Sequence, residues 1–323
     1  LDLYHQSQFH QATNDEIRRV VTDTVTAPKR HIARVLAHVD AERIRARKFR
    51  VALDGVNGAG SVMSVQFLRE VLGCELHAIS VDPSRPFPRE AEPRPEVLGD
   101  LQALIRQTNA EVAFAQDPDG DRLAVGDEMG RILDNDDVLA LAVDCALRRR
   151  KGPVVVNLTT SAVIDDVAAR HGCSVFRAPV GEANVVERMK TAGAIIGGEG
   201  ANGGIIFPAV QYCRDSYMGM AFLLDRMAET GQTMSELAAT LPAYHRRLGK
   251  LPFEHGRLGQ MMQALERGFP GALVNRSDGL KLTVAGGWIH LRASNTEPIL
   301  RVAAEARTQD QLEELYAKAS SVA

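Results

Sequence analysis

The fold is decided by Phe49-Arg50-Val51-Ala52-Leu53-Asp54-Gly55-Val56-Asn57-Gly58-Ala59-Gly60, a short apolar strand that runs into a polar, glycine-rich turn. An amphipathic stretch ending at Leu72 follows, and residues 73–77 then read as a second strand. The same order returns at residues 154–176, where Val154-Val155-Val156 leads through a polar turn into a helical stretch and another strand. Short β-branched strands that alternate with helical periods indicate βαβ units and a mostly parallel sheet. The sequence therefore predicts an α/β protein with two related mixed-sheet α/β domains in tandem.

The two polar turns that follow the first strands are interpreted as structural. Residues 54–60 are rich in glycine, but the G-x-G-x-x-G spacing of a dinucleotide-binding loop is absent, so we predict a packing turn. Thr159-Thr160-Ser161 has no base or nucleophile elbow around it, so we predict a helix cap.

The pattern of the chain changes after Pro242. Residues 279–283 and 287–291 predict a hairpin, residues 299–303 a further strand, and residues 309–319 a C-terminal helix. A small α+β domain is therefore expected at the C-terminal end.

Bulk composition excludes several classes of function. The 323 residues are 45% hydrophobic and 24% charged, with a formal net charge of -3, which is typical of a globular protein of two or three domains. This charge predicts no nucleic-acid or membrane partner, and no apolar run is long enough to cross a bilayer. Four widely spaced cysteines form no C-x-x-C pair, so we expect free thiols and a cytoplasmic location.

The acidic loop Asp117-Pro118-Asp119-Gly120-Asp121-Arg122 directly follows a predicted strand at residues 111–115. Three carboxylates at alternate positions repel one another, and a divalent cation such as Mg²⁺ would relieve that repulsion. An EF-hand is excluded because Arg122 stands at the sixth position, which requires glycine. A solvated acidic turn and an Asp-x-Asp phosphatase remain alternatives, although the latter would place Thr or Val at Asp121.

Two further loops carry polar residues suited to a sugar phosphate. Residues 197–204 supply the carboxylate of Glu199 and the amide of Asn202, which could bind sugar hydroxyls, or could form only a β-hairpin turn. Residues 292–298 combine an arginine with hydroxyl groups, and Arg301 follows, which suits phosphate; a polar turn with a satisfied arginine is the alternative.

The order of these three loops resembles the α-D-phosphohexomutase superfamily, which includes phosphoglucomutases, phosphomannomutases and phosphoglucosamine mutases. The resemblance runs from Phe49 to the C-terminal helix, and the Arg-x-Ser-Asn-Thr-Glu-Pro motif is its most specific part. Members have three α/β domains and a smaller phosphate-binding domain. The resemblance implies a tail of domain one at residues 1–24, domain two at 25–132, domain three at 133–242 and domain four at 243–323.

The resemblance also implies roles for individual residues. Mg²⁺ would be held by Asp117, Asp119 and Asp121, while Arg122 would reach a phosphoserine or the substrate. Sugar contacts would come from Glu199, Asn202 and Gly203. The phosphate that is not transferred would be bound by Arg292, Ser294, Asn295, Thr296 and Arg301. The family reaction moves a phosphoryl group between C1 and C6 of a hexose phosphate through an enzyme phosphoserine and a bisphosphate intermediate.

Two departures from the family pattern matter. No Thr-x-Ser-His-Asn-Pro loop, the family's phosphoserine site, occurs in this sequence, and the chain begins at Leu1 without a methionine. We therefore expect domain one to be missing and this chain alone to be inactive; a non-catalytic sugar-phosphate-binding protein is the alternative. Many members have Ser-Gly-His after the glutamate, whereas here Asn202-Gly203-Gly204 follows with one additional residue. This form of the loop favours a glucosamine phosphate substrate and a phosphoglucosamine mutase-like member. A monomer or homodimer is expected.

Overall fold

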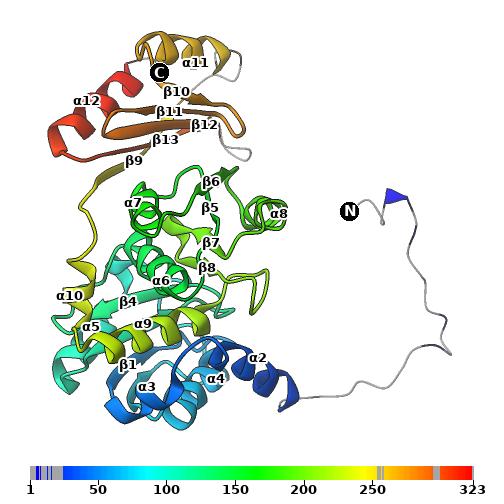
Figure 1. Cartoon of the computed structure of the whole chain (residues 1–323), viewed down its shortest axis with the longest axis vertical. Coiled ribbons are helices and arrows are strands. Elements are labelled where there is room, and N and C mark those ends of the chain that lie inside the picture. The colour runs from blue at the N-terminus through cyan, green and yellow to red at the C-terminus, as the bar shows by residue number, and fades with distance from the viewer. Residues whose placement is uncertain are drawn as a thin grey trace.

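The computed structural model describes residues 25–252, 256, 258–293 and 299–321, together with His5, Gln6, Gln8, Thr13 and Glu16. Three sheets are stacked along the long axis of the molecule, with β1 near one end, β5 in the middle and β11 at the other end (Figure 1). No helix in the described part of the chain is long and apolar enough to cross a membrane.

The first sheet has the strand order β2-β1-β3-β4. Its first three strands are parallel, and β4 runs antiparallel to β3. The strands are β1 (Arg50–Asp54), β2 (Glu75–Ile79), β3 (Val112–Gln116) and β4 (Leu123–Asp127). The helices of this part are α2 (Thr26–Leu36), α3 (Ala41–Arg47), α4 (Ser61–Val65) with its π-helical continuation η2 (Gln66–Val71), the short 3₁₀ turn η3 (Pro95–Val97), and α5 (Gly99–Thr108).

The second sheet repeats this topology in the order β6-β5-β7-β8, again with a last strand that is antiparallel. Its strands are β5 (Val154–Asn157), β6 (Val175–Ala178), β7 (Ile196–Glu199) and β8 (Gly204–Ile206). Its helices are α6 (Asn135–Arg149), α7 (Val163–Arg170), α8 (Glu182–Ala192), the 3₁₀ turn η4 (Gly200–Asn202), α9 (Ser216–Thr230) and α10 (Met234–Ala238). The prediction of two tandem mixed-sheet α/β domains is confirmed.

Helix α9 joins the two sheets. It is apolar over most of its surface, and it packs against α6 on one side and against α2 and α3 on the other. Figure 1 shows α9 lying between α6 and α3. A helix that is buried on nearly all sides belongs to the interior rather than to one surface, and a single hydrophobic core accordingly spans both sheets.

The C-terminal sheet is fully antiparallel in the order β10-β11-β12-β13-β9. Its strands are β9 (His245–Pro252), β10 (Leu273–Asn275), β11 (Leu280–Val284), β12 (Gly287–Ala293) and β13 (Ile299–Ala306), and its helices are α11 (Leu258–Arg267) and α12 (Gln309–Ser320). The predicted hairpin, strand and C-terminal helix are therefore confirmed. The exact domain limits remain predictions.

The two faces of this sheet have different partners. Apolar residues of one face, such as Leu291 and Leu300, pack against α11 and α12. The other face is turned toward the middle sheet: buried Glu305 accepts the Trp288 indole N–H at 2.8 Å and the Ala162 backbone N–H at 2.7 Å. Lys281 Nζ also donates to the Leu158 carbonyl oxygen at 2.6 Å. The contact between these two parts is thus polar and specific, which fixes how the sheet faces the middle domain.

Candidate functional site

The acidic loop connects β3 to β4 and gathers its three carboxylates. Oxygens of Asp117, Asp119 and Asp121 lie within 4.8 Å of one another. The residues present suit a hard divalent cation, because carboxylate oxygens are the ligands that such cations prefer. A buried oxygen of the set, Asp121 Oδ1, has no hydrogen-bond partner in the described part of the chain, and a bound cation would satisfy it.

Burial makes this loop costly without a cation. It raises the pKa of Asp121 to about 6, with the nearby Asp117 carboxylate as the second cause. Burial also raises the pKa of Asp117, although Asp117 Oδ1 accepts the backbone N–H groups of Asp121 at 3.1 Å and Arg122 at 3.0 Å. The loop therefore concentrates negative charge that desolvation opposes.

The glycine-rich turn at residues 54–60 packs directly against the acidic loop. The Ala59 backbone N–H donates to the Pro118 carbonyl oxygen at 2.7 Å. A Cβ atom on Gly58 would lie 2.4 Å from the same oxygen, so only glycine lets the two loops approach this closely. The predicted packing turn is confirmed, and its packing partner is the acidic loop.

A buried hydrogen-bond network also holds the acidic loop in place. Gln116 Nε2 donates to Ser216 Oγ at 2.7 Å, and Ser64 Oγ donates to Gln116 Oε1 at 2.6 Å. The Tyr217 hydroxyl belongs to the same network, because it lies 3.1 Å from Ser64 Oγ. It donates in turn to the Gly60 carbonyl oxygen at 3.1 Å. None of these side chains belongs to a motif, and the sequence offers no signal that would bring them together.

Arg214 is a further residue near the acidic loop that no sequence motif indicates. Its Nη2 lies 2.8 Å from Asp121 Oδ2, and its Nε lies 2.8 Å from Glu182 Oε2 at the start of α8. The stem of Arg214 crosses residues 197–204, the predicted sugar loop, because a Cβ atom on Gly204 would lie 2.4 Å from Arg214 Cδ. One guanidinium thus joins the acidic loop to the middle domain.

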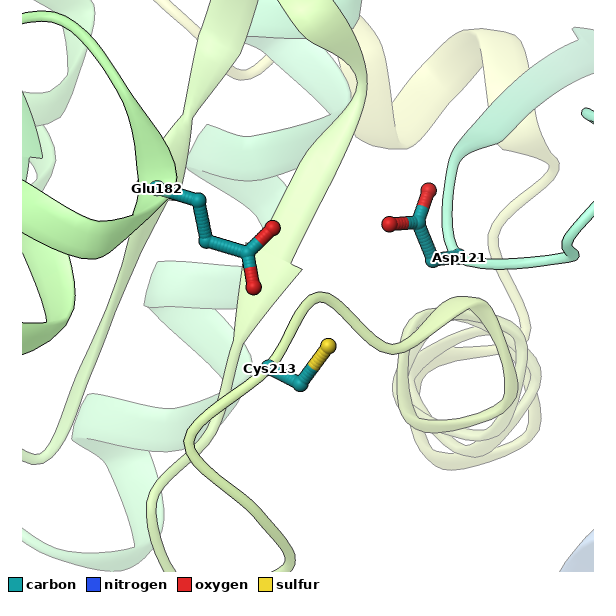
Figure 2. A group of neighbouring side chains, drawn as sticks. All are labelled: Asp121, Glu182 and Cys213. Carbon is teal, nitrogen blue, oxygen red and sulfur yellow. The ribbon is translucent and has the colours of Figure 1, made fainter. Parts of the chain in front are cut away.

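Figure 2 shows Asp121, Glu182 and Cys213 pointing toward a common space from three separate segments. Their ligand atoms lie within 4.8 Å of one another. The Arg214 guanidinium already spans the two carboxylates, and burial raises the pKa of the Cys213 thiol to about 11, so that the thiol stays protonated at neutral pH.

Arg122 lies at the edge of the acidic loop. Its Nη1 donates to Glu92 Oε1 at 2.6 Å, and its Nε lies 3.3 Å from Asp117 Oδ2. The proline-rich segment that carries Glu92 is fastened by Arg89, which donates to Asp54 Oδ2 and to the Gln116 carbonyl oxygen, both at 2.7 Å. Arg122 is therefore held in place by carboxylates, and its role toward a substrate remains a prediction.

The sugar loop directly adjoins the acidic loop. The Leu123 backbone N–H, at the start of β4, donates to the Gly203 carbonyl oxygen at 3.0 Å. Glu199, at the end of β7, accepts the Asn157 side-chain amide and the Gly181 backbone N–H on Oε1, both at 2.8 Å. No described residue donates to the other oxygen, Oε2. This oxygen is therefore available to a ligand hydroxyl.

The alternative interpretation of this loop as a hairpin turn is also correct, because β7 and β8 pair in antiparallel fashion through it. The side chain of Asn202 lies outside the described residues. Thr160, predicted to be a helix cap, instead donates to Asn157 Oδ1 at 2.8 Å and accepts the Gly200 N–H at 3.1 Å. Its hydroxyl supports the sugar loop, whereas Ser161 Oγ accepts the Val163 N–H at the start of α7.

The predicted phosphate loop lies only partly within the described residues. Ser294, Asn295 and Thr296 fall outside them. Arg292 on β12 and Arg301 on β13 face each other across the two strands, and both line a cavity of about 380 Å³ between the C-terminal sheet and the middle domain. Ala201 of the sugar loop and Thr159 line the same cavity. The folding of the chain thus brings the sugar loop close to both arginines.

Comparison with known proteins gives matches along most of the chain. Three family models match: phosphoglucomutase/phosphomannomutase alpha/beta/alpha domain II at residues 29–130, domain III at 134–244 and the C-terminal domain at 254–320. A phosphoglucomutase/phosphomannomutase of Thermococcus kodakarensis is 34% identical over 97% of this chain and 68% of its own length. A probable phosphoglucosamine mutase of Methanopyrus kandleri is 34% identical over 93% of this chain and 66% of its own length.

Solved structures agree. The crystal structure of a phosphoglucomutase/phosphomannomutase family protein from Burkholderia thailandensis has a TM-score of 0.79 and 25% identity, and the match covers 92% of this chain and 64% of that one. This chain therefore spans about two thirds of the length of the relatives it matches. On the three family models and the two relatives, the chain belongs to the phosphoglucomutase/phosphomannomutase family of the α-D-phosphohexomutase superfamily.

Proposed function

We propose that this chain carries the metal-binding, sugar-binding and phosphate-binding parts of a phosphohexomutase, an isomerase that moves a phosphoryl group between C1 and C6 of a hexose phosphate. The observation that carries the proposal is the hydrogen bond between Leu123 N–H and the Gly203 carbonyl oxygen. It brings three carboxylates suited to a cation beside a glutamate with a free oxygen, near a cavity that contains two arginines.

Each group has a separate task in this proposal. Asp117, Asp119 and Asp121 hold Mg²⁺, which when bound would neutralise negative charge on a transferring phosphoryl group. Glu199 accepts hydrogen bonds from two neighbouring sugar hydroxyls through its free oxygen, and Gly203 and Asn202 shape the same loop. Arg292 and Arg301, with Ser294, Asn295 and Thr296, bind the phosphate that stays in place. Arg122 orients the phosphate that moves.

The phosphoryl carrier is the missing element. Residues 1–323 contain no Thr-x-Ser-His-Asn-Pro loop, so we propose that the phosphoserine comes from residues outside this sequence. The 323 residues alone then bind a sugar phosphate without converting it. The second candidate function is a sugar-phosphate-binding protein that performs no catalysis, which would use the same carboxylates, glutamate and arginines.

Glucosamine phosphate is the substrate that we favour. The Gly203-Gly204 form of the sugar loop supports this choice, as does the name of the relative from Methanopyrus kandleri, a probable phosphoglucosamine mutase. A cytoplasmic enzyme fits the free thiols of the four cysteines.

Binding and turnover test the proposal separately. Isothermal titration calorimetry should detect Mg²⁺ binding that Asp119→Asn weakens and that the exposed control Asp100→Asn leaves unchanged. Glucosamine 6-phosphate should bind in a manner sensitive to Glu199→Gln. ³¹P NMR with glucosamine 1-phosphate should show no conversion by the chain alone. Release of inorganic phosphate would favour a phosphatase, and the absence of sugar-phosphate binding would reject both candidate functions.

A further inference from the structure

The register of the C-terminal sheet places a third cationic side chain in line with the two arginines that are predicted to bind phosphate. Arg292 on β12 lies opposite Arg301 on β13, and Arg301 in turn lies opposite Lys250 on β9. Residues that are directly opposite in antiparallel strands project from the same face. Lys250, Arg301 and Arg292 therefore form a row across three adjacent strands, and Lys250 lies outside the predicted phosphate loop.

The row lies on the face that is turned toward the middle domain. Two residues further along the same strands, Leu248 and His290 flank Ala303, and the next row contains Glu305, which hydrogen-bonds to Ala162 of the middle domain. The intervening residues, Val302 and Leu291 among them, pack against the helices on the opposite face. Consistent with this alternation, Lys250 lines the same cavity of about 380 Å³ as both arginines.

The charges in this row are only partly compensated. Arg292 Nε lies 2.9 Å from Asp278 Oδ1. Lys250 and Arg301 are exposed, and neither has a carboxylate partner among residues 25–252, 258–293 and 299–321. Like charges directly opposite each other destabilise a sheet. Among the residues that the structure describes, three cations with one carboxylate leave two positive charges, which matches a phosphate dianion.

The other basic groups near the row do not supply this charge. Arg246 forms an ion pair with the buried Asp136 and donates to the Thr159 carbonyl oxygen at 3.0 Å. Burial lowers the pKa of His290, whose Nε2 hydrogen-bonds to the Asp278 carbonyl oxygen at 2.7 Å. The excess positive charge at the cavity therefore resides on Lys250 and Arg301.

We propose that Lys250 is a phosphate-binding residue that acts with Arg301 and makes the site selective for a doubly charged phosphate monoester. This inference rests on the proposed function, because it assumes that the cavity takes the phosphate of a sugar phosphate. Lys250 offers a compact ammonium on a flexible stem, whereas Arg301 offers a planar fork. The two donors can therefore contact different oxygens of one phosphate.

Calorimetric titration of the chain with glucosamine 6-phosphate at constant ionic strength tests the inference. Lys250→Met should weaken binding about tenfold, as expected for the loss of one charge-assisted contact, and Lys250→Arg should retain most of the affinity. The control Lys151→Met removes an exposed lysine that does not line the cavity and should leave the affinity unchanged. Because the second pKa of a phosphate monoester is about 6, Lys250→Met should also reduce the gain in affinity between pH 5 and pH 7.5.

The outcomes separate the two proposals. If Arg292→Met and Arg301→Met weaken binding while Lys250→Met binds as the unmodified chain does, the role of Lys250 is wrong and the proposed function stands. If the unmodified chain binds no sugar phosphate, both are wrong. Circular dichroism and the melting temperature of Lys250→Met establish that lost affinity does not reflect unfolding.

Discussion

Ser216 Oγ, on the first residue of α9, donates a 2.6 Å hydrogen bond to the carbonyl oxygen of Gly120 at the tip of the acidic loop. Both groups are buried, and Ser216 is only 1% exposed. Gly120 has a φ of +75°, a left-handed conformation that favours glycine. Helix α9 of the middle domain thus fixes the shape of a loop that connects two strands of the first sheet.

Replacing this hydroxyl should loosen the loop. Ser216→Ala removes the donor to the Gly120 carbonyl oxygen and the acceptor of the Gln116 amide. These two groups then keep only their long mutual contact of 3.5 Å, so the free energy of unfolding should fall by about 1–3 kcal/mol. Mg²⁺ affinity should fall with it, because the carboxylates lose their fixed positions. Urea denaturation and calorimetry measure the two effects, with the exposed Ser277→Ala as the control. Unchanged Mg²⁺ affinity in a destabilised Ser216→Ala protein would show that the network does not position the loop.

The contact between Gly58 and Pro118 predicts a steric effect. Gly58→Ala places a Cβ atom 2.4 Å from the Pro118 carbonyl oxygen, and relieving such an overlap typically costs about 1–3 kcal/mol. Either the turn or the acidic loop must move, so Mg²⁺ binding should weaken. Gly99→Ala is the matched control, because nothing lies within 4 Å of its Cβ position. The prediction is wrong if the two alanine variants bind Mg²⁺ equally well.

Arg214 should stabilise the fold most when no metal is present. Arg214→Met leaves Asp121 and Glu182 without their shared cation, and in EDTA the free energy of unfolding should fall by about 2 kcal/mol or more. Saturating Mg²⁺ should reduce the stability difference between Arg214→Met and the unmodified chain, because a cation at Asp121 replaces part of the lost positive charge. Thermal denaturation with and without Mg²⁺ measures this. Arg148→Met, which removes an exposed partner of Asp144, should show no dependence on Mg²⁺.

Asp137 predicts a pH dependence of stability. Burial raises its pKa from 3.8 to about 6, with the Asp134 carboxylate as the second cause. A folded-state pKa above the unfolded value means that the native state binds the proton more tightly, so the contribution of Asp137 to stability is fully present below pH 3.8 and is lost as pH rises through 6. Asp137→Asn should therefore stabilise the protein by about 1–2 kcal/mol at pH 8, and by much less at pH 4. Equal effects at both pH values in urea denaturation would contradict the assignment.

Much of the fold was readable from local sequence. Short-range rules of period and turn chemistry predict the apolar strands around Val51 and Val155, the polar turns after them and the hairpin at residues 279–291. The resemblance to the family rested on three loops, each of them continuous in sequence. The acidic loop and the sugar loop were therefore identified as candidates, and the family assignment is confirmed by the comparisons.

The supporting residues could not be predicted in this way. Arg214 stands 93 residues after Asp121, and Ser216 stands 96 residues after Gly120. Lys250 joins the cationic row only through the register of β9 against β13. Thr160 was interpreted from its neighbours as a helix cap, and its contact with Gly200 required the pairing of β5 with β7.

The sequence by itself determined which chemical groups this protein possesses and the class of fold that carries them, because strand period, turn composition and ligand type are local properties. Only the tertiary structure decided which side chains hold those groups in place. Hydrogen bonds and ion pairs act over about 3 Å, and residues come within that distance through packing of α9 and through strand register, not through spacing along the chain. The acidic loop is a sequence feature; its shape and its partners belong to the fold.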